Sequence, residues 1–346
     1  MMRVSLRRLC SPAISRATSS SQPIPAATIL RSDDSTGDGN AFFSEIESHY
    51  GAERVSSMIR AMCETDHNRK YAMWINPFLR QTNGAAVDDQ IAALNLQHVH
   101  GNLYATADYA PLPRPPFLES DRGSTKSAEN IQLYYPFDIA SAFPAIALTQ
   151  PLPDGSGSHP NHIVDCCASP GGKFLLALGD MLSKRLDSNV SDACWWTALA
   201  CEMDPNRFSR LRGTLSRYVP ESFRKQIKVI REDSSVVPFP SAEVILVDAP
   251  CSSDRHLLGR ILTEVSNAKE KGRPVWENQE DFDRTKEEWF ATTEERFKRE
   301  WGGAVARKNA EKQTALLMNA TRAQNSFCQR VVYSTCALAP LENDLV

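Results

Sequence analysis

The chain has 346 residues, enough for one large α/β domain and a smaller partner domain, and its 42% hydrophobic content is ordinary for a globular protein. The net charge of -3 provides no overall attraction to nucleic acid, so any RNA contact must use local basic patches. Nine irregularly spaced cysteines without a Cys-x-x-Cys pair argue against a zinc site and a disulfide framework, and no apolar run approaches the roughly 20 residues that span a bilayer.

The first 32 residues have the composition of a mitochondrial transit peptide. They contain no acidic residue, are rich in Ser and Ala, and carry arginines at positions 3, 7, 8, 16 and 31. They also lack the apolar core of a secretory signal. The alternative is an unstructured cytosolic tail, which the absence of Asp and Glu disfavours. We therefore expect residues 1–32 to be a targeting segment and the protein to be mitochondrial.

Residues 33–135 are expected to form a small N-terminal lobe of helical and irregular structure that binds RNA. Apolar residues recur at helical spacing over residues 42–62. The following stretch mixes short apolar runs with turn signals such as Asn83-Gly84 and a Pro-rich segment. A helix over residues 138–148 should then lead into the next domain, with Pro144 kinking it or lying near its start.

Residues 136–346 are predicted to form a catalytic α/β domain around a parallel sheet. Short apolar runs alternate with helical segments, which is typical of a sheet covered on both faces. The runs lie at residues 162–165, 195–201, 227–230, 244–247 and 331–334. A densely charged segment, residues 264–312, is predicted to be a helical insertion. Its charges are interpreted as a solvated face, with RNA contact as the alternative.

The loop between the first predicted strand and its helix has the character of a cofactor-binding turn. It comprises Cys167, Ala168, Ser169, Pro170, Gly171, Gly172 and Lys173. Small residues and paired glycines let a ligand approach the backbone, and the helix N-terminus offers N–H groups to a carboxylate. A Walker phosphate loop is excluded, because Cys167 stands where its first glycine would be and Phe174 where Ser or Thr would follow the lysine. A generic glycine-rich turn is the alternative.

Acidic residues stand at the ends of three further predicted strands. Glu202 closes the second strand, Asp233 follows the third and Asp248 closes the fourth. In an open α/β sheet, ligands bind at the carboxyl ends of the strands, so these residues should share one crevice. A carboxylate after the second strand suits two ribose hydroxyls, and one after the third can accept from an adenine amine. The pattern predicts an adenosine-bearing cofactor.

Two cysteines follow neighbouring predicted strands: Cys251 follows the fourth and Cys336 the fifth. Carbon 5 of cytosine is a weak nucleophile until a thiolate adds to carbon 6, and a second group must then assist proton removal and thiolate release. A cysteine on each strand end, with Asp248 available to hold the ring nitrogen, supplies these parts. Either cysteine alone would be interpreted as a packing residue.

The chain resembles the Nop/Sun family of RNA cytosine-5 methyltransferases over roughly residues 130–346. The resembling motifs are Cys-Ala-Ser-Pro-Gly-Gly-Lys at 167–173, Asp-Ala-Pro-Cys at 248–251 and Tyr-Ser-Thr-Cys at 333–336. The resemblance implies a class I (Rossmann-like) methyltransferase fold with S-adenosyl-L-methionine as cofactor. It further implies that Cys336 is the nucleophile, that Cys251 assists product release and that Asp248 contacts the target cytosine. The positions that match the family around cofactor and base are Gly172, Lys173, Glu202, Arg207, Asp233 and Asp248.

Three further stretches are similar to the mitochondrial ribosomal RNA branch of this family. They are Tyr134-Tyr135 with Asp138–Ser141, Arg217–Pro220 and Ser252–His256. We therefore expect ribosomal RNA as substrate, a partner protein from mitochondrial ribosome assembly, and neither a membrane nor a metal. The alternatives are a mitochondrial transfer RNA methyltransferase and a non-catalytic ribosome-assembly factor that binds RNA.

The chain departs from the family pattern in its C-terminal part. The stretch between Cys251 and Cys336 is longer than usual, the Lys-Pro-Gly-Gly turn is replaced by Asn325–Cys328, and the sequence ends ten residues after Cys336. We therefore expect C-terminal strands to be missing. The fifth strand should lie at an unpaired sheet edge with one face lacking its helix, which predicts poor solubility and weak activity.

Overall fold

The computed structural model describes most of the predicted catalytic domain and much of the N-terminal lobe. The residues described are 3–8, 39–57, 71–106, 114–120, 129–153, 159–187, 197–254, 256–257, 260–261, 264, 291–293, 295–297, 299–300, 303–322, 327–343 and 346. Most of the predicted transit peptide and the greater part of the charged insertion lie outside these residues. None of the described helices is long and apolar enough to cross a membrane.

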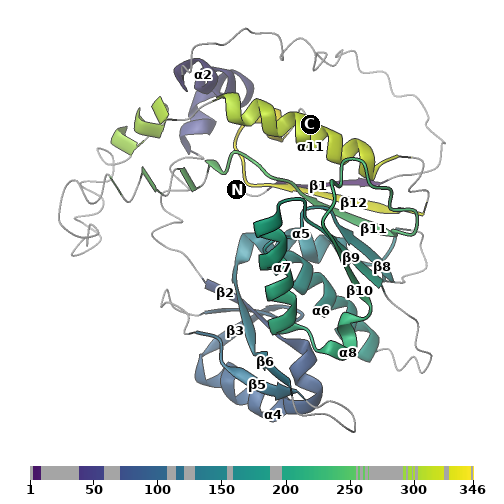
Figure 1. Cartoon of the computed structure of the whole chain (residues 1–346). Coiled ribbons are helices and arrows are strands. Elements are labelled where there is room, and N and C mark those ends of the chain that lie inside the picture. The colour runs from purple at the N-terminus through teal and green to yellow at the C-terminus, as the bar shows by residue number, and fades with distance from the viewer. Residues whose placement is uncertain are drawn as a thin grey trace, which may run out of the picture.

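A six-stranded sheet in the order β1-β12-β11-β8-β9-β10 forms the centre of the molecule (Figure 1). Five strands are parallel: β8 (His162–Asp165), β9 (Thr197–Cys201), β10 (Ile227–Ile230), β11 (Val244–Asp248) and β12 (Arg330–Thr335). The predicted parallel sheet is confirmed. Because the strand order reverses between β8 and β11, the carboxyl ends of these strands border the crevice where doubly wound proteins bind ligands.

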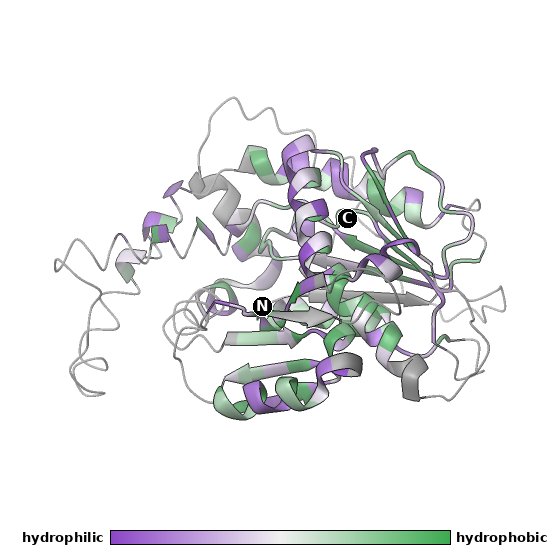
Figure 2. Cartoon of the chain, turned by 60° about the horizontal axis from the view of Figure 1, so that its bottom comes forward, coloured by the Kyte–Doolittle hydropathy of each residue, from purple (hydrophilic) through white to green (hydrophobic). Residues whose placement is uncertain are grey.

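Helices cover both faces of this sheet. On β11, Val244 and Leu246 pack into a core shared with α5 (Ile139–Leu148), α6 (Gly172–Asp187) and α7 (Pro205–Tyr218). Ile245 and Val247 point to the other face and join a core that includes Leu316 of α11 (Gly303–Ala320). Along the surface helices, hydrophobic residues alternate with hydrophilic ones (Figure 2). The near-continuous apolar run of β11 therefore reflects burial on both sides.

The expectation of an exposed sheet edge at β12 is wrong. Strand β1 (Arg3–Arg8) pairs antiparallel with β12 over its full length, from Arg3 opposite Thr335 to Arg8 opposite Arg330. The expectation of an uncovered sheet face is also wrong, because α11 packs there. Sequence reasoning missed the first pairing because it assigned residues 3–8 to the transit peptide. That assignment and the predicted weak activity remain predictions.

The N-terminal lobe is more regular than predicted. Its four-stranded antiparallel sheet has the order β3-β4-β2-β7. The elements of the lobe are α2 (Gly39–Tyr50), β2 (Tyr71–Ile75), α4 (Pro77–Ala93), β3 (Leu96–His100), β4 (Leu103–Thr106), the hairpin β5 (Phe117–Ser120) and β6 (Glu129–Gln132), and β7 (Tyr134–Asp138). The prediction of an irregular lobe over residues 71–150 is therefore wrong for the described residues, which form strands and helices. Strand β7 also runs across the domain boundary predicted between residues 135 and 136.

The lobe is joined to the catalytic domain through buried contacts. Trp74 on β2 is fully buried in the main core, and a Cβ on Gly179 of α6 would lie 2.7 Å from its ring. The Asn76 side chain donates a hydrogen bond of 2.8 Å to the Tyr218 carbonyl at the end of α7. The predicted helix after β7 is confirmed as α5, with Asp138 capping it by accepting from the Ala140 N–H and Pro144 inside it. These contacts hold the lobe against α6 and α7.

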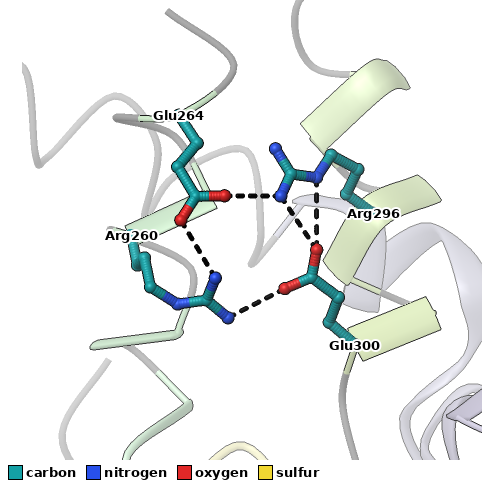
Figure 3. Close-up of polar contacts among 4 residues, drawn as sticks. All are labelled: Arg260, Glu264, Arg296 and Glu300. Carbon is teal, nitrogen blue, oxygen red and sulfur yellow. Dashed lines mark hydrogen bonds and ion pairs between the residues drawn. The ribbon is translucent and has the colours of Figure 1, made fainter. Parts of the chain in front are cut away.

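Four charged side chains, two from residues 260–264 and two from residues 296–300, form a closed ring of ion pairs (Figure 3). Arg260 binds Glu264 at 3.0 Å and Glu300 at 2.8 Å, and Arg296 binds Glu264 at 2.6 Å and Glu300 at 2.9 Å. The ring joins the segment after Cys251 to the segment before α11. These side chains are between 25% and 52% exposed, so salt partly screens the ion pairs and they add only modest stability. Trp276, Trp289 and Trp301 lie outside the described residues.

Candidate active site

The loop after β8 is held to its neighbours by backbone hydrogen bonds. The Cys166 N–H donates to Leu246 O at 2.9 Å and the Ala168 N–H to Cys201 O at 3.0 Å. Gly171 has φ +114°, which favours glycine, and a Cβ on Gly172 would lie 2.8 Å from the Tyr135 ring. The turn and its packing against β7 therefore account for both glycines, whereas the sequence interpretation had assigned them to ligand approach.

Arg207 ties the predicted ribose-binding residue to this loop. Its Nε donates to Glu202 Oε2 at 2.9 Å, and its Nη2 donates to Ser169 O at 2.8 Å. The Ser169 hydroxyl returns a bond of 2.8 Å to Arg207 O. Glu202 is only 7% exposed, and its other oxygen accepts from the Asp204 N–H at 3.0 Å. Arg207 thus orients the carboxylate at the end of β9.

Asp233 lies just beyond the carboxyl end of β10. Its carboxylate accepts from the Ser235 N–H at 2.9 Å, and this hydrogen bond lowers its pKa, so the group is ionised at neutral pH. The next residue, Ser234, donates to Cys166 O at 2.8 Å and so connects this segment to the loop after β8. The arrangement keeps the charged Asp233 carboxylate, a hydrogen-bond acceptor, at the carboxyl end of β10.

Lys173 and Asp248 form an ion pair at the carboxyl ends of the strands, with Nζ and Oδ2 2.7 Å apart. Burial opposes the charge on Lys173, yet the Asp248 carboxylate outweighs it and raises the lysine pKa overall. Asp165, at the end of β8, is 2% exposed. Burial, followed by the negative charge of Asp248, raises the Asp165 pKa to about 7. The crevice therefore concentrates carboxylates around one lysine.

The two predicted cysteines come together at the carboxyl ends of β11 and β12. Their Sγ atoms lie 3.1 Å apart, and each residue is partly exposed. The pairing of Asp248 with Ser334 in the sheet sets the register that brings the two loops level. Asp248 and Cys336 both raise the pKa of Lys173, so the Cys336 sulfur lies near the ion pair. The structure thus brings together Asp248, Cys251 and Cys336 as predicted.

The two thiols titrate as a pair. A hydrogen bond from the Cys336 thiol stabilises a thiolate on Cys251 and lowers the Cys251 pKa, and the same negative charge raises the pKa of Cys336. The pair therefore loses its first proton more readily than an isolated cysteine and its second less readily. By contrast, burial raises the pKa of Cys166, Cys167 and Cys201. The 251/336 pair thus has the chemical character of a nucleophilic site.

Sequence reasoning missed four buried polar residues around the site. They are Asp165, Asp254, Gln313 and Glu342. Gln313 carried a signal, because it and Asn319 are polar residues on the buried stripe of α11 that includes Ala306, Ala310 and Leu316. No group of three or more metal-binding side chains gathers within the described part of the chain.

Comparisons with known proteins agree with the motifs. No protein-family model matches the chain. A mitochondrial tRNA (cytosine(34)-C(5))-methyltransferase of Danio rerio is 31% identical over 198 residues, covering 55% of this chain and 48% of the relative. The 5-cytosine rRNA methyltransferase NSUN4 of Xenopus tropicalis is 29% identical over 218 residues, covering 62% of this chain and 41% of the relative. The chain is a relative of RNA cytosine-5 methyltransferases.

The chain spans less than half the length of these two relatives. Among solved structures, the match to NSun6 from Pyrococcus horikoshii with SFG covers 87% of this chain and 84% of the NSun6 chain, at 14% identity and a TM-score of 0.45. The resemblance to RNA cytosine-5 methyltransferases drawn from three short motifs is thus confirmed over a longer stretch of sequence.

Proposed function

We propose that this chain methylates carbon 5 of cytosine in RNA, with S-adenosylmethionine as methyl donor and Cys251 and Cys336 as its reactive cysteines. The observation that carries the proposal is the 3.1 Å separation of the two sulfurs at adjacent strand ends, beside the Lys173–Asp248 pair. The relatives' activity towards cytosine in RNA supports it.

The residues at the carboxyl ends of β8, β9 and β10 fit S-adenosylmethionine. The buried Glu202 carboxylate, held by Arg207, suits two ribose hydroxyls, and ionised Asp233 can accept from the adenine amine. The N–H groups in the first turn of α6 have no acceptor within the helix, so they can donate to the carboxylate of the cofactor. The remaining members of the predicted set, Cys167 to Lys173, form the loop that connects these parts. When bound, the cofactor supplies the methyl group.

Cys336 is the proposed nucleophile, and the resemblance of its Thr-Cys motif carries that assignment. Its thiolate adds to carbon 6 of the cytosine, which makes carbon 5 nucleophilic. After methyl transfer, Cys251 assists removal of the carbon 5 proton and cleavage of the sulfur–carbon bond, which returns the thiolate. In the free protein the negative charge lies on Cys251, and the sulfurs are 3.1 Å apart, so the Cys336 thiol can pass its proton to Cys251 as it attacks the base.

Asp248 and Lys173 have a proposed electrostatic role at the base. Asp248 would bind the ring nitrogen of the target cytosine, and Lys173 holds this carboxylate in place at 2.7 Å. Addition of a thiolate to carbon 6 places negative charge on a ring nitrogen, and the Lys173 cation stabilises this charge. A carboxylate only accepts hydrogen bonds, so Asp248 holds the ring nitrogen when that nitrogen carries a proton.

Mitochondrial ribosomal RNA is the proposed substrate, with binding assigned to the N-terminal lobe and an assembly protein as partner. The Xenopus tropicalis relative is an rRNA methyltransferase, which supports this choice. The relative from Danio rerio is a mitochondrial tRNA methyltransferase, which makes mitochondrial transfer RNA the second candidate. The acid-free residues 1–32 support mitochondrial targeting.

Bisulfite sequencing of organellar RNA with and without this protein tests the proposal. Without the protein, one ribosomal RNA cytosine that is otherwise protected from bisulfite should lose its protection. If the protection is lost at a transfer RNA position instead, transfer RNA is the substrate. Unchanged methylation everywhere, together with RNA binding, would favour the non-catalytic assembly factor.

A further inference from the structure

Two buried carboxyl groups connect the loops that carry the reactive cysteines. One loop, Ala249–Asp254, follows β11 and carries Cys251. The other, Cys336–Asn343, follows β12 and carries Cys336. Asp254 is 1% exposed and Glu342 is 0% exposed, and each belongs to a different loop. Carboxyl groups buried this completely require specific partners.

The hydrogen bonds of these two residues are reciprocal. Asp254, from the Cys251 loop, accepts from the Leu338 N–H of the other loop at 2.6 Å and from the Ser252 hydroxyl of its own. Glu342, from the Cys336 loop, accepts from the Ser252 N–H of the other loop at 2.9 Å. Each loop therefore binds the backbone of the other within two residues of a cysteine.

A helix on the sheet face completes the connection. The Gln313 amide of α11 donates to Glu342 Oε1 at 3.0 Å and to Pro250 O at 2.7 Å, next to Cys251. Burial, together with the negative charge of Asp254, raises the Glu342 pKa to about 7, although the hydrogen bond from Ser252 acts in the opposite direction. The second carboxyl oxygen of Glu342 has no hydrogen-bond partner among the described residues, so one oxygen makes both contacts.

The Cys336 loop is also closed upon itself. The Tyr333 hydroxyl donates to Glu342 O at 2.8 Å, and the Asn343 amide donates to Ala337 O at 2.7 Å. The backbone of this loop is therefore held by its own hydrogen bonds, independently of the contact between Glu342 and Ser252. A change at Glu342 or Asp254 should alter the relation between the two loops more than the shape of either.

We propose that Asp254 and Glu342 are positioning residues that hold Cys251 and Cys336 at reacting distance. They act through the loops and contact neither the base nor the cofactor. For its catalytic consequence this inference rests on the proposed function, but the separation of the two sulfurs can be measured without RNA.

The test is the rate at which the purified chain closes a Cys251–Cys336 disulfide in diamide. This azo compound accepts the two thiol hydrogens as the S–S bond forms, and peptide mass spectrometry identifies the linked pair. The sulfurs must move from 3.1 Å to about 2.05 Å, so the rate reports how well they are held together. The wild type should cross-link readily, and its failure to do so would overturn the geometry.

Glu342→Ala and Asp254→Ala should each slow the cross-link by about tenfold or more, as loss of a hydrogen bond to a carboxylate implies. Glu342→Gln should recover most of the rate, because one amide oxygen can serve both Ser252 and Gln313. Glu311→Ala, which removes an exposed carboxylate from α11, is the matched control. Wild-type rates in both alanine variants would overturn the proposal.

Two further measurements separate positioning from general loss of structure. Calorimetric affinity for S-adenosylmethionine should stay unchanged in Glu342→Ala, whereas kcat for methyl transfer should fall with KM unchanged. If the alanine variants fail to fold, Asp254→Leu still decides, because it keeps a branched side chain of similar shape but offers no acceptor to Leu338 or Ser252. A wild-type cross-linking rate there would overturn the proposal. A chain that cross-links as expected but never methylates RNA would sink the proposed function alone.

Discussion

Replacement of Glu202 by Gln should weaken cofactor binding without disturbing the fold. The carboxylate offers roughly four acceptor sites, and the structure uses one for the Asp204 N–H and one for Arg207. Two sites therefore stay available for ribose hydroxyls. Glutamine has one acceptor oxygen and no charge, so Arg207 and the ribose would compete for it.

The expected magnitude follows from this loss. A hydrogen bond to a charged group contributes about 1.5–3 kcal/mol, which corresponds to roughly tenfold to hundredfold in the Kd for S-adenosylmethionine. Isothermal titration calorimetry at fixed salt measures it, with Glu311→Gln on the far sheet face as control. A Kd for Glu202→Gln equal to that of the wild type would refute the assignment of the ribose site.

Three further predictions concern stability. Gly179→Ala should lower the free energy of unfolding, measured in urea, by about 1–3 kcal/mol, because its Cβ would lie 2.7 Å from the Trp74 ring. The control is Gly213→Ala, which has nothing within 4 Å and should be neutral or stabilising. Equal losses of stability in the two variants would contradict the packing argument. The pKa of Asp165 is raised to about 7, so the folded state binds the proton of this group more tightly than the unfolded state does. Stability should therefore fall as pH rises from about 4 to 7, and Asp165→Asn should flatten that slope. Parallel pH profiles of the two proteins would contradict this prediction. Deletion of residues 1–32 removes β1 and should expose the edge of β12, which light scattering would detect as aggregation; unchanged solubility would show that the pairing is dispensable.

The sequence was sufficient to predict the parallel sheet and the position of the paired cysteines. β11 and β12 are buried on both faces and therefore appear as continuous apolar runs, and their carboxyl ends must meet at one edge. The antiparallel lobe was not predictable in the same way. β3, for example, has the sequence Leu-Gln-His-Val-His and is largely exposed, so its strand pairing depends on β4 and leaves little apolar signal.

The supports of the site were less accessible from sequence than its reactive groups. Glu342 binds Ser252 across 90 positions of the chain, so no local spacing relates the two. β1 did carry a signal, because Val4 and Leu6 alternate with polar residues in a strand-like period. Because the arginines in this stretch are also typical of a targeting segment, the alternation was not interpreted as a strand.

The central claim is that Cys336 attacks the cytosine and that Cys251 assists its release. Incubation of RNA and S-adenosylmethionine with the wild type, Cys251→Ala, Cys336→Ala and the double variant, followed by a denaturing gel, tests this directly. The account predicts that Cys251→Ala accumulates a covalent protein–RNA adduct, and that both variants lacking Cys336 form neither adduct nor methylated RNA. Normal turnover by Cys251→Ala without an adduct, or an adduct in Cys336→Ala, would contradict the two-cysteine mechanism.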